Sequence, residues 1–159
     1  MKNNYLLFFV LFFASSCTTT FYVVRHAEKS TIPKENPLLT EKGAARAENL
    51  KEILKNKSIK TIYSTQTERT EATARPLAKH LQQEILPYQA KNQSELIEQL
   101  KLSKNNTLIV GHSNTIRHII NGLAENEILK NDLEDSDYGG LYIIKRSKNG
   151  KPRFLKKEF

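Results

Sequence analysis

Two short stretches of the sequence place a histidine at the end of a run of apolar residues. Phe21–Val24 is followed directly by Arg25 and His26, and Thr107–Val110 stops one residue short of His112. Each run is typical of a buried strand in a parallel sheet. Ligands bind such sheets at the carboxyl ends of their strands. The sequence therefore predicts that both histidines lie at one edge of a sheet, where a ligand would bind.

A third predicted strand, Ile59–Tyr63, leads through a polar segment to Arg69. Arginine offers a planar fork for phosphate or carboxylate, and histidine can act as nucleophile, base or cation. If the three strand ends face one crevice, then Arg25, His26, Arg69 and His112 form a strongly cationic pocket with no obligatory carboxylate. Such a pocket suits a tetrahedral dianion such as phosphate and could stabilise a phosphoryl group in transfer without a metal. Neighbours on a regular strand point to opposite faces, so Arg25 and His26 can reach one ligand only if the chain leaves strand geometry there.

The elements that would position these residues alternate between strand and helix. Helices are expected at 41–56, through 77–81, at 94–102 and at 115–123, and a further strand at 84–88. Thr40 is the predicted N-cap of the first helix, and Gly43 should weaken its first turn by about 1 kcal/mol relative to alanine. Two strands around Asn149-Gly150 predict a hairpin. The pattern indicates an α/β three-layer sandwich: a mostly parallel central sheet, helices on both faces and a C-terminal edge hairpin.

The first residues read as a targeting segment. Lys2 precedes the apolar run Leu6–Phe13, which is far shorter than the roughly 20 residues needed to span a bilayer. Ala14-Ser-Ser-Cys17 resembles the lipobox of bacterial lipoprotein signals, with Ala14 where leucine is usual. That resemblance implies lipidation of Cys17 after cleavage. An ordinary signal peptide with an incidental cysteine and a buried N-terminal strand are the alternatives. We expect a signal peptide at 1–16, a short tether at 17–20 and one domain at 21–159.

The charge and cysteine content of the chain limit which kinds of partner and cofactor are expected. The chain has 25 Lys and Arg against 17 Asp and Glu, a formal net charge of +8. This balance suits anionic lipid or anionic substrates, and a solvated lysine-rich surface would explain it equally well. No stretch interleaves aromatic and basic residues, so nucleic acid is not expected. The single cysteine excludes intramolecular disulfides and thiolate zinc clusters, and the acidic loop Asp132–Asp137 lacks the spacing of an EF-hand. We expect no metal, no cofactor and a monomer.

Three motifs, in order, resemble those of the histidine phosphatase superfamily, also called phosphoglycerate mutase-like. Arg25-His26-Ala27-Glu28 is similar to the first motif, with alanine in place of glycine. The segment from Tyr63 to Ala78, with Arg69 at the family's spacing, is similar to the second, and Val110 to Ile116 to the third. Together they span most of the chain after the predicted signal peptide.

The resemblance implies a phosphatase that hydrolyses a phosphomonoester or an activated phosphate without a metal. His26 would be the nucleophile and form a phosphohistidine, Arg25 and Arg69 would clamp the phosphoryl oxygens, and His112 would donate to the phosphoryl group. The partners would be a small phosphorylated substrate and, through lipid on Cys17, a bacterial membrane on its periplasmic or outer-membrane side. Structural histidines at 26 and 112 and a surface arginine at 69 are the alternatives to these roles.

The general acid is where the sequence departs from the family. Many members carry an Asp or Glu between the second and third motifs or directly after the second histidine, and Ser113 occupies the latter place here. Glu95 is the candidate acid, with Glu98 and Glu28 as further choices. A well-placed acid typically contributes about 10²–10⁴-fold. Without one, the favoured substrates would be phosphates with good leaving groups, such as phosphohistidine, acyl and aryl phosphates or polyphosphate.

Two other functions stay open from the sequence. A non-catalytic phosphate-binding lipoprotein would keep the cationic pocket and need no acid. A phosphoglycerate mutase-type phosphotransferase would need a larger insert to hold its substrate, and the short segment between Ala90 and Asn106 offers little room for one.

Overall fold

The computed structural model describes residues 18–148 and 150–159 of the chain. Its strands are β1 (Thr18–Arg25), β2 (Ile59–Ser64), β3 (Ile85–Pro87), β4 (Asn106–Gly111), β5 (Gly140–Ser147) and β6 (Gly150–Glu158). Its helices are α1 (Glu41–Leu54), α2 (Glu68–Leu81), α3 (Ser94–Leu102) and α4 (Ser113–Ala124). The predicted alternation of strands and helices is therefore confirmed.

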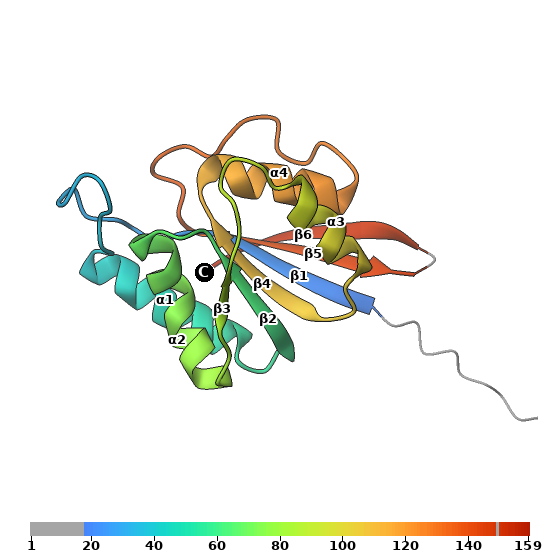
Figure 1. The fold of residues 1–159 in the computed structure, drawn as a ribbon, viewed down its shortest axis with the longest axis horizontal. Coiled ribbons are helices and arrows are strands. Elements are labelled where there is room, and N and C mark those ends of the chain that lie inside the picture. Colours follow the sequence, from blue (N-terminus) through green and yellow to red (C-terminus); the bar gives the residue numbers. More distant parts are fainter. Residues whose placement is uncertain (1–17, 149) are drawn as a thin grey trace, which may run out of the picture.

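All six strands form one sheet, in the order β3-β2-β4-β1-β5-β6 (Figure 1). The pairs β2–β3, β2–β4 and β1–β4 are parallel, whereas β5 runs antiparallel to both β1 and β6. The expected mostly parallel sheet with a C-terminal edge hairpin is thus confirmed. The parallel strands β1, β2 and β4 end on the same side of the molecule, which is the side where the predicted site residues follow them.

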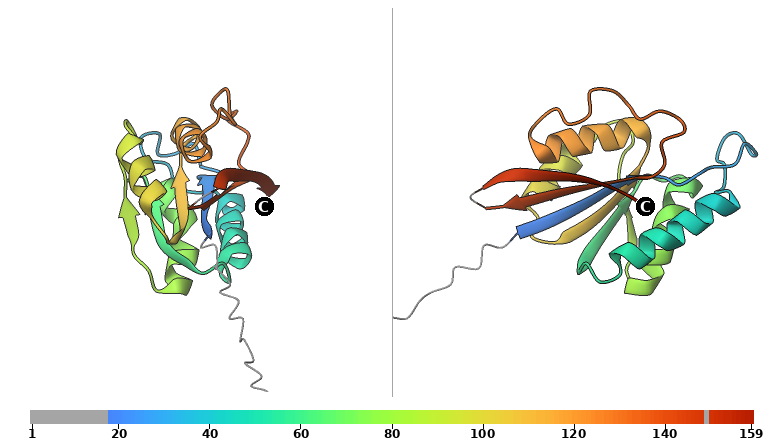
Figure 2. Two further views of the ribbon diagram at one scale, coloured as in Figure 1. Left: turned by 90° about the vertical axis from the view of Figure 1, so that its right-hand side faces the viewer. Right: turned by 180° about the vertical axis from the view of Figure 1, so that it is seen from behind.

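The apolar run of β1 is buried on both faces because helices cover both sides of the sheet (Figure 2). Tyr22 and Val24 belong to a core with residues of α1 and α2, while Phe21 and Val23 belong to a second core with residues of α3 and α4. This explains why the run does not alternate between apolar and polar residues: each face of the strand meets its own hydrophobic layer.

The start of β1 differs from the expectation. Thr18–Thr20 were expected in a short tether, but they pair with Lys145–Ser147 of β5 and so belong to the sheet. The long antiparallel hairpin partner supplies backbone hydrogen bonds that extend the strand by these residues. The predicted signal peptide and Cys17 lie outside the described residues. Within the described part of the chain, no helix is long and apolar enough to cross a membrane.

Helix α1 shows why a helix-weakening residue stands in its first turn. Thr40 caps the helix, its side chain accepting from the Gly43 N–H at 3.0 Å, as predicted. A Cβ on Gly43 would lie only 2.2 Å from the Glu28 carbonyl oxygen. The glycine therefore lets the helix approach the loop after β1 closely, and this contact opposes the expected loss of helix stability.

Candidate active site

The pairing of β1 with β4 brings the two predicted histidines together. Arg25 lies beside Gly111 in the parallel register, and the His26 N–H donates to the Gly111 carbonyl at 2.8 Å. The rings of His26 and His112 are 5.5 Å apart between centroids, edge to face. A Cβ on Gly111 would lie 2.2 Å from the Tyr88 hydroxyl oxygen, so only glycine fits where the chain turns from β4 into α4.

His26 is held with one ring nitrogen free. Its Nδ1 lies 2.8 Å from the Ala27 carbonyl oxygen. A carbonyl only accepts, so Nδ1 carries the hydrogen and Nε2 keeps its lone pair. Burial, and then the charges of Arg25, His112 and Arg69, lower the pKa of His26 to about 3, although the Ala27 hydrogen bond acts the other way. The ring is therefore neutral at neutral pH, as a nucleophile must be.

His112 connects Arg69 to a chain of hydroxyl groups. Arg69 Nη2 lies 3.4 Å from His112 Nδ1, and His112 Nε2 lies 3.0 Å from Thr65 Oγ1. Because a guanidinium only donates, Nδ1 accepts and Nε2–H donates to Thr65. The Thr65 hydroxyl in turn donates to Thr70 Oγ1 at 3.1 Å, and the Thr70 hydroxyl to the Thr65 carbonyl at 2.7 Å. Burial first, then Arg69, Arg25 and Lys29, lower the pKa of His112 to about 4.

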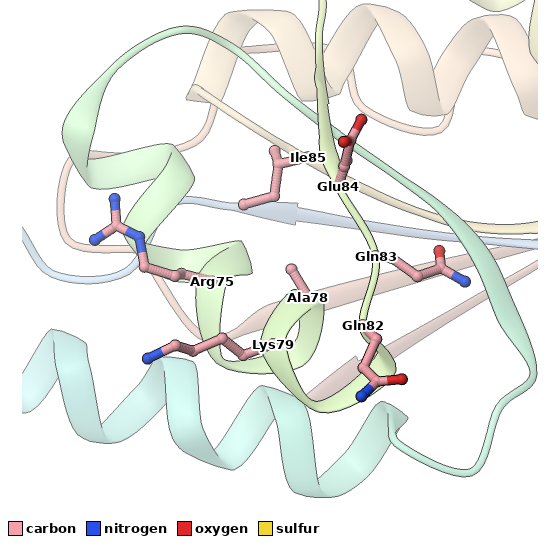
Figure 3. Close-up of a pocket in the computed structure, with 7 residues that line it drawn as sticks. All are labelled: Arg75, Ala78, Lys79, Gln82, Gln83, Glu84 and Ile85. Carbon is pink, nitrogen blue, oxygen red and sulfur yellow. The ribbon is translucent and has the colours of Figure 1, made fainter.

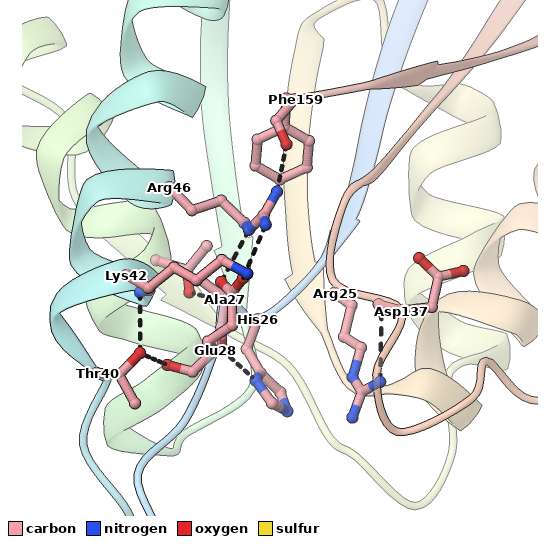
Figure 4. Close-up of polar contacts among 11 residues, drawn as sticks. Arg25, His26, Ala27, Glu28, Thr40, Lys42, Arg46, Asp137 and Phe159 are labelled. Atoms are coloured by element: carbon pink, nitrogen blue, oxygen red, sulfur yellow. Dashed lines mark hydrogen bonds and ion pairs between the residues drawn. The ribbon is translucent and has the colours of Figure 1, made fainter.

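Arg25 is oriented by the acidic loop. Its Nη1 donates to the Glu134 carbonyl at 2.7 Å and to the Asp137 carbonyl at 3.3 Å (Figure 4). Nη2 lies 3.4 Å from an Asp135 carboxylate oxygen, and the guanidinium carbon is 4.5 Å from the centre of the Tyr138 ring. The Nε atoms of Arg25 and Arg69 are buried and have no hydrogen-bond partner among the described residues. Buried donors without an acceptor are costly, so they mark a place for a ligand rich in acceptors.

Comparison with known proteins agrees with this geometry. Residues 21–99 match the family model described as histidine phosphatase superfamily (branch 1), a segment that contains Arg25, His26 and Arg69. The chain carries a histidine phosphatase superfamily domain. No curated protein matches the chain.

Solved structures show the same fold at low identity. The histidine phosphatase domain is similar to the protein histidine phosphatase SixA in complex with tungstate: 15% identity, a TM-score of 0.68, and coverage of 88% of this chain and 97% of that one. For a phosphoserine phosphatase from Entamoeba histolytica the values are 18%, 0.61, 89% and 97%. For a phosphoglycerate mutase from Plasmodium falciparum they are 18%, 0.59, 89% and 90%.

Glu28, one of the candidate acids, is committed to an ion pair. Its two carboxylate oxygens accept from Arg46 at 2.7 and 2.8 Å, and Lys42 lies 3.4 Å away (Figure 4). Arg46 also donates to the Phe159 carbonyl. The hydrogen bond from Arg46 is the main cause that lowers the pKa of Glu28 to about 2. An acid so strongly ionised cannot hold a proton for a leaving group at neutral pH.

The other two candidate acids lie apart from the pocket of the histidine phosphatase domain. Glu95 is exposed in the first turn of α3 and lines a hollow with Tyr63, Gln66 and Tyr88. Glu98 pairs with Lys101 at 2.8 Å. In residues 18–148 and 150–159, neither carboxylate contacts Arg25, His26, Arg69 or His112, and no cluster of His, Cys, Asp or Glu is arranged to hold a metal ion.

A further hollow lies near the end of α2 and holds none of the predicted site residues. It is lined by Arg75, Ala78, Lys79 and the segment Gln82–Ile85 (Figure 3). Its walls carry no histidine and no residue of the cationic pocket, so it is separate from the candidate active site.

Three residues around the pocket were not singled out from the sequence. Thr65 contacts His112 as described, and Thr73 accepts from the Ala27 N–H at 2.9 Å while donating to the Arg69 carbonyl at 2.7 Å. Both threonines lie in the second motif, so their place beside Arg69 was a usable signal. Tyr138, whose ring is 5.8 Å from that of His26, follows the acidic loop and had no signal of its own.

Proposed function

We propose that the chain is a phosphatase that hydrolyses a phosphomonoester or an activated phosphate through a phosphohistidine on His26. The observation that carries this proposal is a neutral, buried histidine with a free Nε2, 5.5 Å from a second histidine and within electrostatic reach of two arginines. No carboxylate neutralises Arg69 among the described residues. The likeness to proteins named as phosphatases supports the same reading.

The reaction would proceed in two displacements. His26 Nε2 attacks the phosphorus atom while the cations Arg25 and Arg69 bind the phosphoryl oxygens, so positive charge meets the charge that develops in transfer. The neutral His112 lies beside Arg69 and orients it. The bond to the leaving group breaks as the P–N bond forms. Water then attacks the phosphohistidine, phosphate leaves, and His26 returns to its neutral form.

The test is a direct search for the covalent intermediate. The full chain is mixed with radiolabelled acetyl phosphate and quenched in alkali, because phosphohistidine is lost in acid. We expect label on the native chain, none on His26→Ala, and label on His80→Ala, a matched control since His80 is exposed on α2 outside the pocket. Equal turnover by the native chain and His26→Ala would contradict the proposal.

Two added measurements, of phosphate binding and of 3-phosphoglycerate conversion, decide between this function and its alternatives. Tight phosphate binding with neither label nor turnover would favour a non-catalytic phosphate-binding protein. Formation of 2-phosphoglycerate from 3-phosphoglycerate would favour a mutase. The substrate-binding insert that a mutase needs has little room here, since β3 and β4 are linked only by α3 and short loops.

We also propose that the chain is held at a bacterial membrane through lipid on Cys17. In support, β1 begins at Thr18 and ends at Arg25, so the attachment point and the pocket would lie at opposite ends of one strand. Basic side chains surround the first end: a hollow there is lined by Lys101, Lys104, Arg146 and Lys148, among others. Metabolic labelling with radioactive palmitate should mark the native chain and not Cys17→Ser; equal labelling of the two would contradict the anchor.

A further inference from the structure

The pocket needs a proton donor, and the ring of Tyr138 lies beside Arg25 and His26. We propose that Tyr138 is the general acid that protonates the leaving group, in the role for which the sequence offered only carboxylates. This inference rests on the proposed phosphatase function and adds to it the residue that makes poor leaving groups accessible.

The position of Tyr138 is the first argument. Its ring centre lies 4.5 Å from the guanidinium carbon of Arg25 and 5.8 Å from the ring centre of His26. It also lies within electrostatic reach of Arg69: burial and then Arg25 lower the pKa of Arg69, and Tyr138 acts in the opposite direction. The ring thus lies against Arg25 and His26 and influences Arg69 electrostatically. A phosphoryl group bound by these residues would have the tyrosine beside it.

The Tyr138 side chain is held in place while its hydroxyl has no partner in the described part of the chain. Tyr138 is half-buried, and none of the described residues makes a hydrogen bond with its hydroxyl. The backbone around it is fixed: Glu134 and Asp137 accept from Arg25 on one side, and the Gly139 carbonyl accepts from the Phe159 N–H at 3.1 Å on the other. A held ring with a free hydroxyl can donate to a substrate with little loss of conformational freedom.

The carboxylates near the pocket are the third argument, because each is engaged elsewhere or turned outward. Glu28 is paired with Arg46, and Glu95 lies in the separate hollow described above. The Asp137 side chain is 4.0 Å from Lys156 and turns away from Arg25 (Figure 4). Asp135 reaches Arg25 only at 3.4 Å, with a fully exposed side chain.

Tyr138 transfers a proton in each of the two displacements. As His26 Nε2 bonds to phosphorus, the bond from phosphorus to the bridging oxygen breaks, and the Tyr138 O–H passes its proton to that oxygen. The leaving group departs as a neutral alcohol, and a tyrosinate remains beside Arg25 and within electrostatic reach of Arg69. In the second step the tyrosinate takes a proton from the water that attacks the phosphohistidine, so phosphate is released and both side chains return to their starting forms.

The experiment measures how the rate depends on the leaving group. The full chain and Tyr138→Phe are assayed with 4-nitrophenyl, phenyl and methyl phosphate, a series in which the leaving group becomes steadily poorer. We expect Tyr138→Phe to lose about 10²-fold or more in kcat/KM on methyl phosphate and only a few-fold on 4-nitrophenyl phosphate. The phenylalanine keeps the ring and its contact with Arg25, so the fold is preserved. Tyr63→Phe, a half-buried tyrosine in the Glu95 hollow, is the matched control and should follow the native chain.

The outcomes separate this inference from the proposed function. Label on His26 from acetyl phosphate in both the native chain and Tyr138→Phe, with the selective loss on methyl phosphate, supports the general acid. Label in both chains with an equal loss on all three esters would reject Tyr138 as the acid and leave the phosphatase standing. The selective loss in Asp135→Asn instead of Tyr138→Phe would also overturn the inference. No label in the native chain would reject the phosphatase itself.

Discussion

Arg46 on one side, and the pocket arginines Arg25 and Arg69 on the other, differ in how far their hydrogen-bond donors find partners within the protein. Arg46 donates to both carboxylate oxygens of Glu28 and to the Phe159 carbonyl. Its guanidinium carbon also lies 5.6 Å from the centre of the Phe159 ring. Arg69 meets only a histidine nitrogen at 3.4 Å, and its Nε, like that of Arg25, has no partner among the described residues. The first arrangement is complete in itself, whereas the second lacks an anion.

The difference separates structural charge from functional charge. A bidentate, partly buried ion pair ties the loop after β1 to α1 and to the C-terminal strand, so its loss should be felt as lost stability. Arg69 is a half-buried cation with no carboxylate partner among the described residues, so it raises the free energy of the empty pocket until an anion binds. We therefore expect changes at Arg46 to alter mainly stability, and changes at the pocket residues to alter mainly activity.

Removal of Arg69 should produce the largest effect. We expect Arg69→Ala to lower kcat/KM for 4-nitrophenyl phosphate by about 10³-fold, because a positive group on the transferring phosphoryl is lost. Stability should change little or rise, since repulsion with Arg25 is relieved. Arg75→Ala, which removes an exposed arginine from the same helix, is the control for steady-state kinetics and thermal unfolding. A loss of stability that matched the loss of activity would place Arg69 with the structural arginines.

Acidification should weaken the empty pocket. The folded chain holds the pKa of His26 at about 3 and of His112 at about 4, below the ordinary value of 6.5. Below pH 6.5 the unfolded chain therefore takes up protons that the folded chain does not, and stability falls as the pH falls. We expect a loss of about 3 kcal/mol between pH 6.5 and 4.5, under the limit of about 1.4 kcal/mol per pH unit for each histidine.

Urea unfolding at fixed pH values measures this slope. Saturating phosphate should flatten it, because a bound anion favours the protonated histidines, and His26→Asn should remove part of it. The Glu28 pair acts in a separate window: its carboxylate has a pKa lowered to about 2 from 4.5, so its stabilisation is lost only as the pH falls below 4.5. A slope between pH 6.5 and 4.5 that His26→Asn and His112→Gln leave unchanged would contradict the assignment.

The paired arginine should show the reverse behaviour of Arg69. Arg46→Ala leaves Glu28 with only the exposed Lys42 as a partner, at a place where the Arg46 and Glu28 side chains are 18% and 13% exposed. This burial is intermediate between a surface pair and a fully buried one, so we expect a loss of about 2 kcal/mol in the free energy of unfolding. The midpoint temperature of thermal unfolding should fall by about 8 °C.

The matched control for Arg46 is Lys42→Ala, which removes the other cation near Glu28. Lys42 is 77% exposed and 3.4 Å from the carboxylate, so its loss should cost under about 1 kcal/mol. Activity of the folded protein at 25 °C should be retained in both variants. A loss of activity near 10³-fold in Arg46→Ala, with stability unchanged, would show that Glu28 belongs to the chemistry.

Much of this arrangement could be predicted from the sequence, for a physical reason. The apolar runs at Phe21–Val24 and Thr107–Val110 have to be buried on both faces, and parallel strands of that kind end at a common edge. Arg25 and His26 follow the first run directly, and His112 follows the second after one glycine, so the local pattern places them. Arg69 lies five residues past the end of β2, and its place followed from the resemblance to a family motif.

What the sequence could not supply depends on contacts between distant segments. Glu28 is adjacent in sequence to His26, yet its partner Arg46 comes from the next helix, and only that pairing takes it out of the list of acids. Tyr138 stands after an acidic loop with no regular pattern, and its position follows from carbonyl contacts with Arg25 that no periodicity encodes. The early start of β1 likewise depends on pairing with β5, more than a hundred residues away.

Thr65 gives the smallest and most specific effect, because it acts on the pocket only through His112. Its hydroxyl accepts from Nε2–H at 3.0 Å, which keeps Nδ1 turned to Arg69. Thr65→Val keeps the shape but removes that acceptor, so His112 loses its fixed tautomer and we expect kcat/KM to fall by about 10-fold, or about 1.4 kcal/mol. Thr65→Ser keeps the hydroxyl and should restore most of the activity, which a packing effect would not do.

The ¹⁵N shifts of His112 should report one dominant tautomer in the native chain and in Thr65→Ser, and a mixture in Thr65→Val. If valine and serine were equally impaired while the tautomer stayed the same, the threonine would be a packing residue and the hydroxyl chain would have no part in setting His112.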